Sequence, residues 1–285
     1  MKKIFLILSI VIVLLVVNDF NYSKKIFKRY LLHMPELVTL SFEENVFNKD
    51  TVFTVPKIQK VIAHGGGQYK DMRVSNSMDA LENNYIKGYR CFELDVNLTS
   101  NDSIAFIHDW ETTLQKYFVM KNQLSFREYE SAKMINGLHQ ITLHSLSEWL
   151  YNKDDVFIIT DVKDNNIKVL QYIKEKYPAI QRHIIPQIYY FREYAKVRKM
   201  GYQNIILTLY RSNYDDELVV EFAKNFPLFG ITMWYSRALT DLPLKLSQNN
   251  VRVFAHTVND TSLRSKLLVN GVYGVYTDFL NPEIN

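Results

Sequence analysis

The chain has 285 residues, 47% of them hydrophobic, which is enough for one large domain with a sizeable core and a smaller appendage. Its formal net charge of +4 comes from residues 1–29, where six lysines and arginines stand against one aspartate. The remaining chain sums to −1 and has no overall basic field to attract nucleic acid. Its single cysteine, Cys91, excludes an intramolecular disulfide and leaves the redox compartment open.

An apolar run near the N-terminus extends from Ile4 to Val17, is interrupted only by Ser9, and comes after two lysines. Its length suits the core of a signal peptide better than a full membrane span. The residues after it offer no pair of small residues for signal cleavage. We therefore expect residues 1–22 to form an uncleaved signal-anchor helix, with a cleaved export signal as the alternative.

The basic residues around this run point to membrane phospholipid as a partner. More of them lie after the run than before it, which by the positive-inside rule would keep the domain in the cytoplasm. Short N-terminal segments of this kind usually export the domain attached to them, so we expect an extracytoplasmic domain, with the cytoplasmic face as the alternative. Residues 23–58 are expected to form a juxtamembrane linker before a folded domain at 59–285: residues 23–31 are open between a short basic amphipathic helix at the lipid interface and an extended stalk, and residues 35–56 show no clear period.

From residue 60 onward, strand patterns alternate with helix patterns. Strands are expected at 60–64, 91–99, 156–161, 184–189, 205–210, 230–234, 251–257 and 274–277, and helices at 76–87, 126–134, 146–151, 167–176, 191–200, 214–225, 241–248 and 261–269. A short extended piece is expected at 104–108. Eight strands, each but the last followed by a helical pattern, predict an α/β fold closed into a (β/α)₈ TIM barrel.

The second expected strand has two different faces. One face is apolar and carries Phe92, Leu94, Val96 and Leu98, while the other carries Cys91, Glu93, Asp95 and Asn97. The apolar face suits packing under helices. Two buried like charges on the opposite face would raise each other's pKa unless a cation lies between them. This strand therefore predicts a metal site.

Other reactive side chains fall at the ends of expected strands, where TIM barrels place their active sites. His64 ends the first strand, Asp161 and Lys163 share one face at the end of the third, and His108 ends the short extended piece. Glu93, Asp95 and Asp161 form an all-oxygen set suited to one divalent cation, Mg²⁺ or Ca²⁺. The two histidines are then free for proton transfer. A plain ion pair between Asp161 and Lys163 is the simpler alternative.

The order and spacing of these residues resemble the glycerophosphodiester phosphodiesterase family of the phospholipase-C-like phosphodiesterase barrels. The matching pieces are His64-Gly65-Gly66, Ser75-Asn76-Ser77, Glu93-Leu94-Asp95, His108-Asp109, Asp161-Val162-Lys163, Thr257-Val258-Asn259 and a closing strand that ends in Thr277-Asp278. The resemblance extends from about residue 60 to the C-terminus. It departs from the family pattern at Gly65, where the family has arginine, and at Asp161, where it has glutamate.

The resemblance implies a reaction and a set of roles. The cation would hold the phosphodiester oxygens, while His64 and His108 exchange protons with the attacking hydroxyl and the leaving alkoxide, which predicts a bell-shaped pH profile. Lys163 would contact the phosphate, and Asn76 would contact the substrate. His256, where the family usually has tryptophan, is open between substrate contact and core. The glycines that begin at Gly65 are open between a plain turn and a cradle whose backbone N–H groups would approach the phosphate in place of the lost arginine.

These inferences favour metal-dependent hydrolysis of a glycerophosphodiester or a phospholipid head group. One alternative is a phospholipase C- or D-like lipid hydrolase. Another is a non-catalytic barrel that binds phosphorylated glycans or lipid head groups, which the loss of arginine at Gly65 keeps open. The expected partners are a small-molecule or lipid phosphodiester and the membrane, with no nucleic acid and no obligate protein partner. The substrate alcohol, the preferred ion and the oligomeric state do not follow from the sequence.

Overall fold

The computed structural model describes residues 58–282. The expected signal-anchor at 1–22 and almost all of the linker at 23–58 lie outside the described residues. Within the described range, no helix combines the length and apolar character that crossing a membrane requires.

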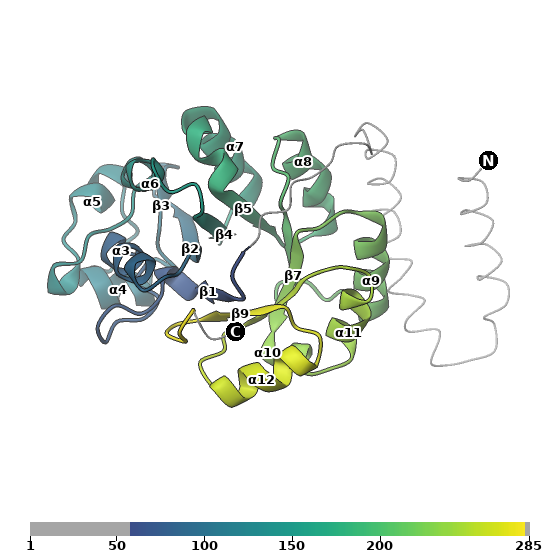
Figure 1. Ribbon diagram of the computed structural model, residues 1–285. Helices are drawn as coiled ribbons and strands as arrows, with labels where there is room; N and C mark the ends of the chain where they lie inside the picture. The colour runs from purple at the N-terminus through teal and green to yellow at the C-terminus, as the bar shows by residue number, and fades with distance from the viewer. Residues whose placement is uncertain (1–57, 283–285) are drawn as a thin grey trace. The chain divides into compact units, whose positions relative to one another are not determined.

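Eight parallel strands form a closed barrel (Figure 1). They are β1 (Val61–Ala63), β2 (Cys91–Leu98), β4 (Phe157–Val162), β5 (Ile184–Ile188), β6 (Ile206–Thr208), β7 (Gly230–Trp234), β8 (Val253–His256) and β9 (Gly274–Thr277). The barrel closes because β1 pairs with both β2 and β9. The short β3 (Ile104–Ala105) pairs antiparallel with β2 outside the ring. The predicted barrel is confirmed, and each of its strands lies where the sequence pattern places it.

Helices alternate with the barrel strands along the chain. They are α3 (Met78–Ile86), α4 (Thr112–Phe118), α5 (Phe126–Ser131), α6 (Leu143–Leu150), α7 (Asn166–Lys176), α8 (Tyr194–Lys199), α9 (Asp216–Asn225), α10 (Tyr235–Ala238), α11 (Leu242–Ser247) and α12 (Thr261–Val269). Ser77 caps α3, since its hydroxyl accepts a hydrogen bond from the Ala80 amide at 3.2 Å. The short helices α4 and α10 were not expected.

The interior of the barrel has two layers along the strand direction. The lower layer is apolar, and the layer nearer the carboxyl ends of the strands is acidic. Buried side chains from seven strands fill the lower layer, namely Ile62, Cys91, Ile159, Ile185, Ile206, Phe254 and Tyr276. Along β2, Glu93 and Asp95 share the face of Cys91, so they continue from it into the interior toward the carboxyl ends of the strands. Phe92 and Leu94 are buried on the other face of β2, as its alternation predicts.

Register places acidic residues of two strands next to each other. Asp95 of β2 and Asp161 of β4 are direct partners in the parallel pairing. Because neighbouring strands in a sheet lie about 4.8 Å apart, partner side chains on the same face must meet. The barrel therefore brings together two carboxylates that are 66 positions apart in the chain.

A separate apolar core is formed by the segment that is inserted between β2 and β4 in the chain. It contains Ile107, Leu114, Tyr117 and Tyr129 from the inserted segment and also Met72 from the loop after β1. Burial of each large side chain stabilises the insertion by roughly 1.5–3 kcal/mol. This core anchors both the inserted segment and the loop after β1 beside the mouth of the barrel.

Candidate active site

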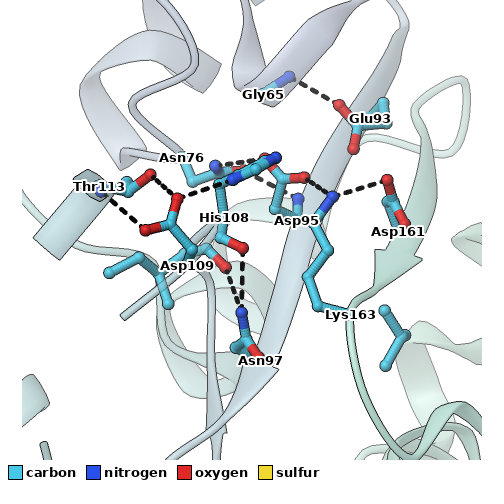
Figure 2. A network of polar contacts seen from close by, with 12 residues as sticks. Gly65, Asn76, Glu93, Asp95, Asn97, His108, Asp109, Thr113, Asp161 and Lys163 are labelled. Atoms are coloured by element: carbon cyan, nitrogen blue, oxygen red, sulfur yellow. Dashed lines mark hydrogen bonds and ion pairs between the residues drawn. The ribbon is translucent and has the colours of Figure 1, made fainter. Parts of the chain in front are cut away.

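Three carboxylates from β2 and β4 converge inside the barrel (Figure 2). Glu93, Asp95 and Asp161 each offer an oxygen, and these oxygens lie within 4.8 Å of one another. The residues are only 2%, 1% and 7% exposed, respectively. Their burial matters because charged carboxylates out of water are costly unless something compensates them.

Fixed hydrogen bonds orient the first two carboxylates. Asn76 donates from Nδ2 to Asp95 Oδ2 at 2.9 Å, and its Oδ1 accepts the Asp95 amide at 2.9 Å. The Gly65 amide donates to Glu93 Oε2 at 2.8 Å. Asn76 was expected to contact the substrate, and in the structure its amide group is engaged with Asp95. Its direct contact with a substrate stays a prediction.

Asp161 is held by two tyrosines that follow the next two strands of the barrel, β5 and β6. Both of its carboxylate oxygens accept hydrogen bonds from tyrosine hydroxyls, Oδ1 from Tyr189 and Oδ2 from Tyr210. Burial would raise the pKa of Asp161, but the charge of Lys163 and these hydrogen bonds lower it. Asp161 therefore stays ionised inside the barrel.

Lys163 lies between two of the carboxylates. Its Nζ is 2.6 Å from Asp95 Oδ1 and 2.8 Å from Asp161 Oδ2. Burial alone would lower the pKa of Lys163, but the surrounding carboxylates raise it above its ordinary value. The ion pair considered as an alternative is therefore present, and contact between Lys163 and a phosphate stays a prediction.

The cluster fits a hard divalent cation. Lys163 compensates Asp95 and Asp161, but burial and the Asp95 charge raise the pKa of Glu93 well above its ordinary range. A buried carboxylate with a raised pKa shows a shortage of positive charge, which a divalent cation would supply. All three donors are oxygens, the ligands that Mg²⁺ and Ca²⁺ prefer.

His64 lies directly after β1, at the start of the 3₁₀ turn η1 (His64–Gly66). Its Nδ1 is 2.8 Å from Asp278 Oδ1, and Asp278 Oδ2 accepts from Asn259 Nδ2 at 2.7 Å. Burial would lower the pKa of His64, but the bond to Asp278 and the charges of Glu93 and Asp95 raise it to about 9. The imidazole is therefore protonated at neutral pH, with Nε2 left for a substrate.

His108 belongs to a second histidine–carboxylate pair, which is more exposed. Its Nδ1 is 2.8 Å from Asp109 Oδ2, and 49% of its side chain is accessible. The Thr113 amide and hydroxyl donate to Asp109 at 3.0 and 2.7 Å. The His108 carbonyl accepts from Asn97 Nδ2 at 3.0 Å, which ties the loop to β2. Figure 2 shows His108 on the Asp95 and Asn76 side of the carboxylate cluster, away from Glu93.

His256 ends β8 and lies in an aromatic environment. Its ring stacks on Trp234 with centroids 4.3 Å apart and approaches Tyr210 at 5.1 Å. Burial and the charge of His64 lower the pKa of His256 to about 4. Its Nε2 has no hydrogen-bond partner within residues 58–282, and a neutral imidazole with an unused buried nitrogen is suited to a substrate hydroxyl.

The glycine run is used differently from what we expected. The Gly65 amide donates to Glu93, and the Gly67 amide donates to the His64 carbonyl at 2.8 Å. Both groups serve the protein itself, so the expectation that they would replace a phosphate-binding arginine was wrong at these two positions.

Several residues of the site were missed at the sequence level. They are Asp278 and Asn259 behind His64, Asp109 behind His108, and Tyr189 and Tyr210 on Asp161. The first three lie inside matched motifs, and two of them come directly after a site histidine or the last strand. The tyrosines carried no signal beyond their place at strand ends.

Solved structures share this architecture, although no curated protein matches the chain. An Oleispira antarctica phosphodiesterase, in complex with the product sn-glycerol-3-phosphate, is 17% identical with a TM-score of 0.64, covering 80% of this chain and 95% of its own. A Thermotoga maritima glycerophosphodiester phosphodiesterase is 19% identical with a TM-score of 0.60, covering 78% and 95%. One from Parabacteroides distasonis is 17% identical with a TM-score of 0.60, covering 78% and 94%. At these identities the likeness shows a common fold.

The family is evident from the sequence itself. The pattern of the glycerophosphoryl diester phosphodiesterase family matches residues 64–281, well over half of the chain. The match begins at His64 and spans all the candidate site residues, including His256. The chain therefore belongs to the glycerophosphoryl diester phosphodiesterase family and is a phosphoric diester hydrolase.

Proposed function

We propose that this protein hydrolyses glycerophosphodiesters with one divalent cation, Mg²⁺ or Ca²⁺, and with His64 as general acid and His108 as general base. The observation that carries the proposal is the buried cluster of Glu93, Asp95 and Asp161 with a histidine–carboxylate pair on the β1 side and another on the inserted segment. A cation held by these carboxylates would bind phosphodiester oxygens and neutralise the charge that develops at phosphorus.

His64 is suited to the acid role. Asp278 engages Nδ1 and keeps the ring protonated at neutral pH, since the pKa of His64 is raised to about 9. A divalent cation would offset the contributions of Glu93 and Asp95 to this pKa, while the bond to Asp278 would remain. Nε2–H can then donate its proton to the leaving alkoxide as its bond to phosphorus breaks.

His108 is suited to the base role. Asp109 accepts from Nδ1–H, which leaves Nε2 as the nitrogen with a free lone pair. In a glycerophosphodiester, the glycerol hydroxyl beside the ester gives its proton to Nε2 as its oxygen forms a bond to phosphorus. The products are the free alcohol and a cyclic phosphate. Water then opens the cyclic phosphate with the proton transfers reversed, giving glycerol phosphate.

Other residues complete the substrate contacts in this proposal. Lys163 lies within reach of any phosphate oxygen that approaches Asp95 and Asp161. The unpartnered Nε2 of His256 would bond a glycerol hydroxyl, and Asn76 would act by holding Asp95 as well as by touching the substrate. The complex of the Oleispira antarctica relative with sn-glycerol-3-phosphate supports glycerol phosphate as the retained half.

The reaction is tested on the full chain in detergent with glycerophosphoethanolamine and glycerophosphocholine. We expect release of glycerol phosphate with Mg²⁺ or Ca²⁺, and loss of turnover with chelator and in Glu93→Gln. His144→Ala is the matched control, since this histidine is exposed on α6 and pairs with Glu148. Turnover that persists in chelator would refute the metal dependence. Release of diacylglycerol or phosphatidate from intact phospholipid would favour the phospholipase alternative.

We also propose that residues 1–22 anchor the protein to a membrane with the barrel outside the cytoplasm. The support is the apolar run behind two lysines. Protease added to intact expressing cells should then degrade the barrel, and the protein should sediment with membranes. Protection of the barrel until the cells are lysed would reverse the proposed orientation, and recovery in the medium would indicate a cleaved signal.

A further inference from the structure

The loop after β1 packs directly on Gly65. A Cβ built on Gly65 would lie 2.5 Å from Val74 Cγ1 and 2.6 Å from Val74 Cα, and Gly65 has a φ of +54°. A contact that short with main chain cannot be relieved by a side-chain rotation. Position 65 therefore has no room for an arginine, because Val74 and its backbone occupy the space.

The same loop is fixed on several sides. Gln68 donates its amide to the Asp278 carbonyl at 2.6 Å, and the Asn76 amide donates to the Gly65 carbonyl at 3.0 Å. Met72 is buried in the apolar core of the inserted segment. Tyr117 from α4 donates its hydroxyl to the Arg73 carbonyl. The backbone of Arg73 is thus held in place rather than left as a free surface turn.

The Arg73 side chain lies on the His64 side of the site. Its guanidinium carbon is 4.8 Å from the centroid of the Phe279 ring, and Phe279 comes directly after Asp278, the partner of His64. Burial would raise the pKa of Asp278, but the bond from His64 and the charges of His64 and Arg73 lower it. The Arg73 charge therefore acts on Asp278, the carboxylate of the His64 pair. Arg73 is exposed and forms no ion pair with any residue between 58 and 282.

The charges of the site would leave the negative charge of a bound phosphate uncompensated. A divalent cation together with Lys163 would neutralise Glu93, Asp95 and Asp161, and protonated His64 is neutralised by Asp278. A phosphodiester adds one negative charge, and a phosphomonoester product adds close to two.

Another arginine near the site is already engaged. Arg211 donates to the Lys163 carbonyl at 2.9 Å and stacks on Tyr189 at 4.4 Å. The Arg73 guanidinium, which contacts the Phe279 ring, is not committed to a partner of opposite charge among residues 58–282.

We propose that Arg73 binds the phosphate of substrate and product, supplying from the loop after β1 the guanidinium that Gly65 cannot carry. This inference rests on the proposed function, since it assigns a further contact in the same site. A guanidinium suits this role because its parallel N–H groups match two phosphate oxygens. Stacking on Phe279 would hold its plane before the phosphate arrives.

The test is calorimetric binding of sn-glycerol 3-phosphate to the full chain loaded with Mg²⁺. We expect Arg73→Gln to weaken binding about 10- to 100-fold, and Arg73→Lys and Phe279→Leu to weaken it less. Arg127→Gln is the control, since Arg127 is exposed on α5. Thermal unfolding midpoints within about 2 °C of the native protein would show that the exposed changes leave the fold intact.

A second experiment tests the steric part. Arg at position 65, introduced as Gly65→Arg in the Arg73→Gln background, should fail to restore binding, because its Cβ would meet Val74. Restored binding would overturn the claim that position 65 is closed. The glycerophosphodiester KM should rise more than kcat falls in Arg73→Gln.

The outcomes separate this inference from the proposed function. Native turnover with unchanged binding in Arg73→Gln would overturn the role of Arg73 alone. Arg73-dependent binding without turnover would support Arg73 and refute the hydrolytic mechanism. Absence of any binding by the native protein would overturn the role of Arg73.

Discussion

The two histidine–carboxylate pairs use the same contact in different surroundings. In each pair Nδ1 lies 2.8 Å from a carboxylate oxygen. His64 and Asp278 come directly after the first and last strands of the barrel, and their side chains are 23% and 10% exposed. His108 and Asp109 are neighbours in sequence on the inserted segment and are 49% and 30% exposed. One pair is created by barrel closure, and the other is local.

This difference indicates a division of labour. The pair of His64 and Asp278 lies at the barrel seam, where β1 meets β9. It faces Glu93 and Asp95, whose charges help raise the pKa of His64 to about 9. The local pair is turned toward water, and Asp109 is held well ionised, since burial opposes ionisation but His108 and Thr113 stabilise the carboxylate. A protonated buried imidazole suits an acid, and an accessible one suits a base. Substitutions that affect one pair and spare the other test this contrast.

The largest effect should come from removing either imidazole. We expect His64→Ala and His108→Ala each to lower kcat about 10²- to 10⁴-fold on glycerophosphoethanolamine, the range that general acid–base catalysis contributes. With a 4-nitrophenyl phosphodiester of glycerol, the leaving group needs no proton. Steady-state kinetics should then show His64→Ala regaining most of its activity while His108→Ala stays slow. Recovery of His108→Ala instead would exchange the two roles.

The second effect concerns the alkaline side of the pH profile. Asp278→Asn removes the negative partner of His64, so the pKa of His64 should fall and the alkaline limb of kcat/KM should move to lower pH by about one unit or more. Asp109→Asn should leave that limb in place. The measurement is kcat/KM from pH 5 to 10 with saturating cation. An alkaline limb that moves with Asp109 would show that His108 is the acid.

The site residues that follow from the strand pattern could be predicted from the sequence. Glu93 and Asp95 stood out because acidic residues on one face of an otherwise apolar strand require compensation. His64 and Asp161 stood out as reactive groups at strand ends. Asp278 was visible only as part of a motif, since its partnership with His64 spans 214 positions and depends on the pairing of β1 with β9.

Other parts could not be predicted for physical reasons. Tyr189 and Tyr210 look like core residues in the sequence, and only barrel geometry turns their hydroxyls onto Asp161. Helix α4 was missed because it begins with two β-branched threonines, which have low helix propensity. The collision between position 65 and Val74 also depends on a tertiary contact that no local pattern encodes.

A smaller effect should appear in stability measured with chelator present. His64 has a folded-state pKa of about 9 against an ordinary 6.5, so the folded protein binds one more proton between these values. Its contribution is complete below pH 6.5 and is lost as pH rises to 9, by up to about 3 kcal/mol. The free energy of urea unfolding from pH 6 to 9.5 should therefore fall more steeply for the native protein than for His64→Asn. Glu93 adds a slope of the same sign, so the difference between the two proteins is the test.

The smallest effect belongs to the local pair. Asp109 accepts amide hydrogen bonds from Glu111 at 3.0 Å and Thr113 at 3.0 Å, which caps the start of α4. We expect Asp109→Ala to lower the free energy of unfolding by about 1 kcal/mol and Asp109→Asn by less, since an asparagine oxygen can still cap. The loss of unfolding free energy in each variant should be nearly independent of pH between 6 and 9, because the pKa of Asp109 lies far below this range. The change at His64 should depend on pH. A pH-dependent loss of several kcal/mol would mean that His108 is coupled to folding as tightly as His64, and the contrast between a seam pair and a local pair would fail.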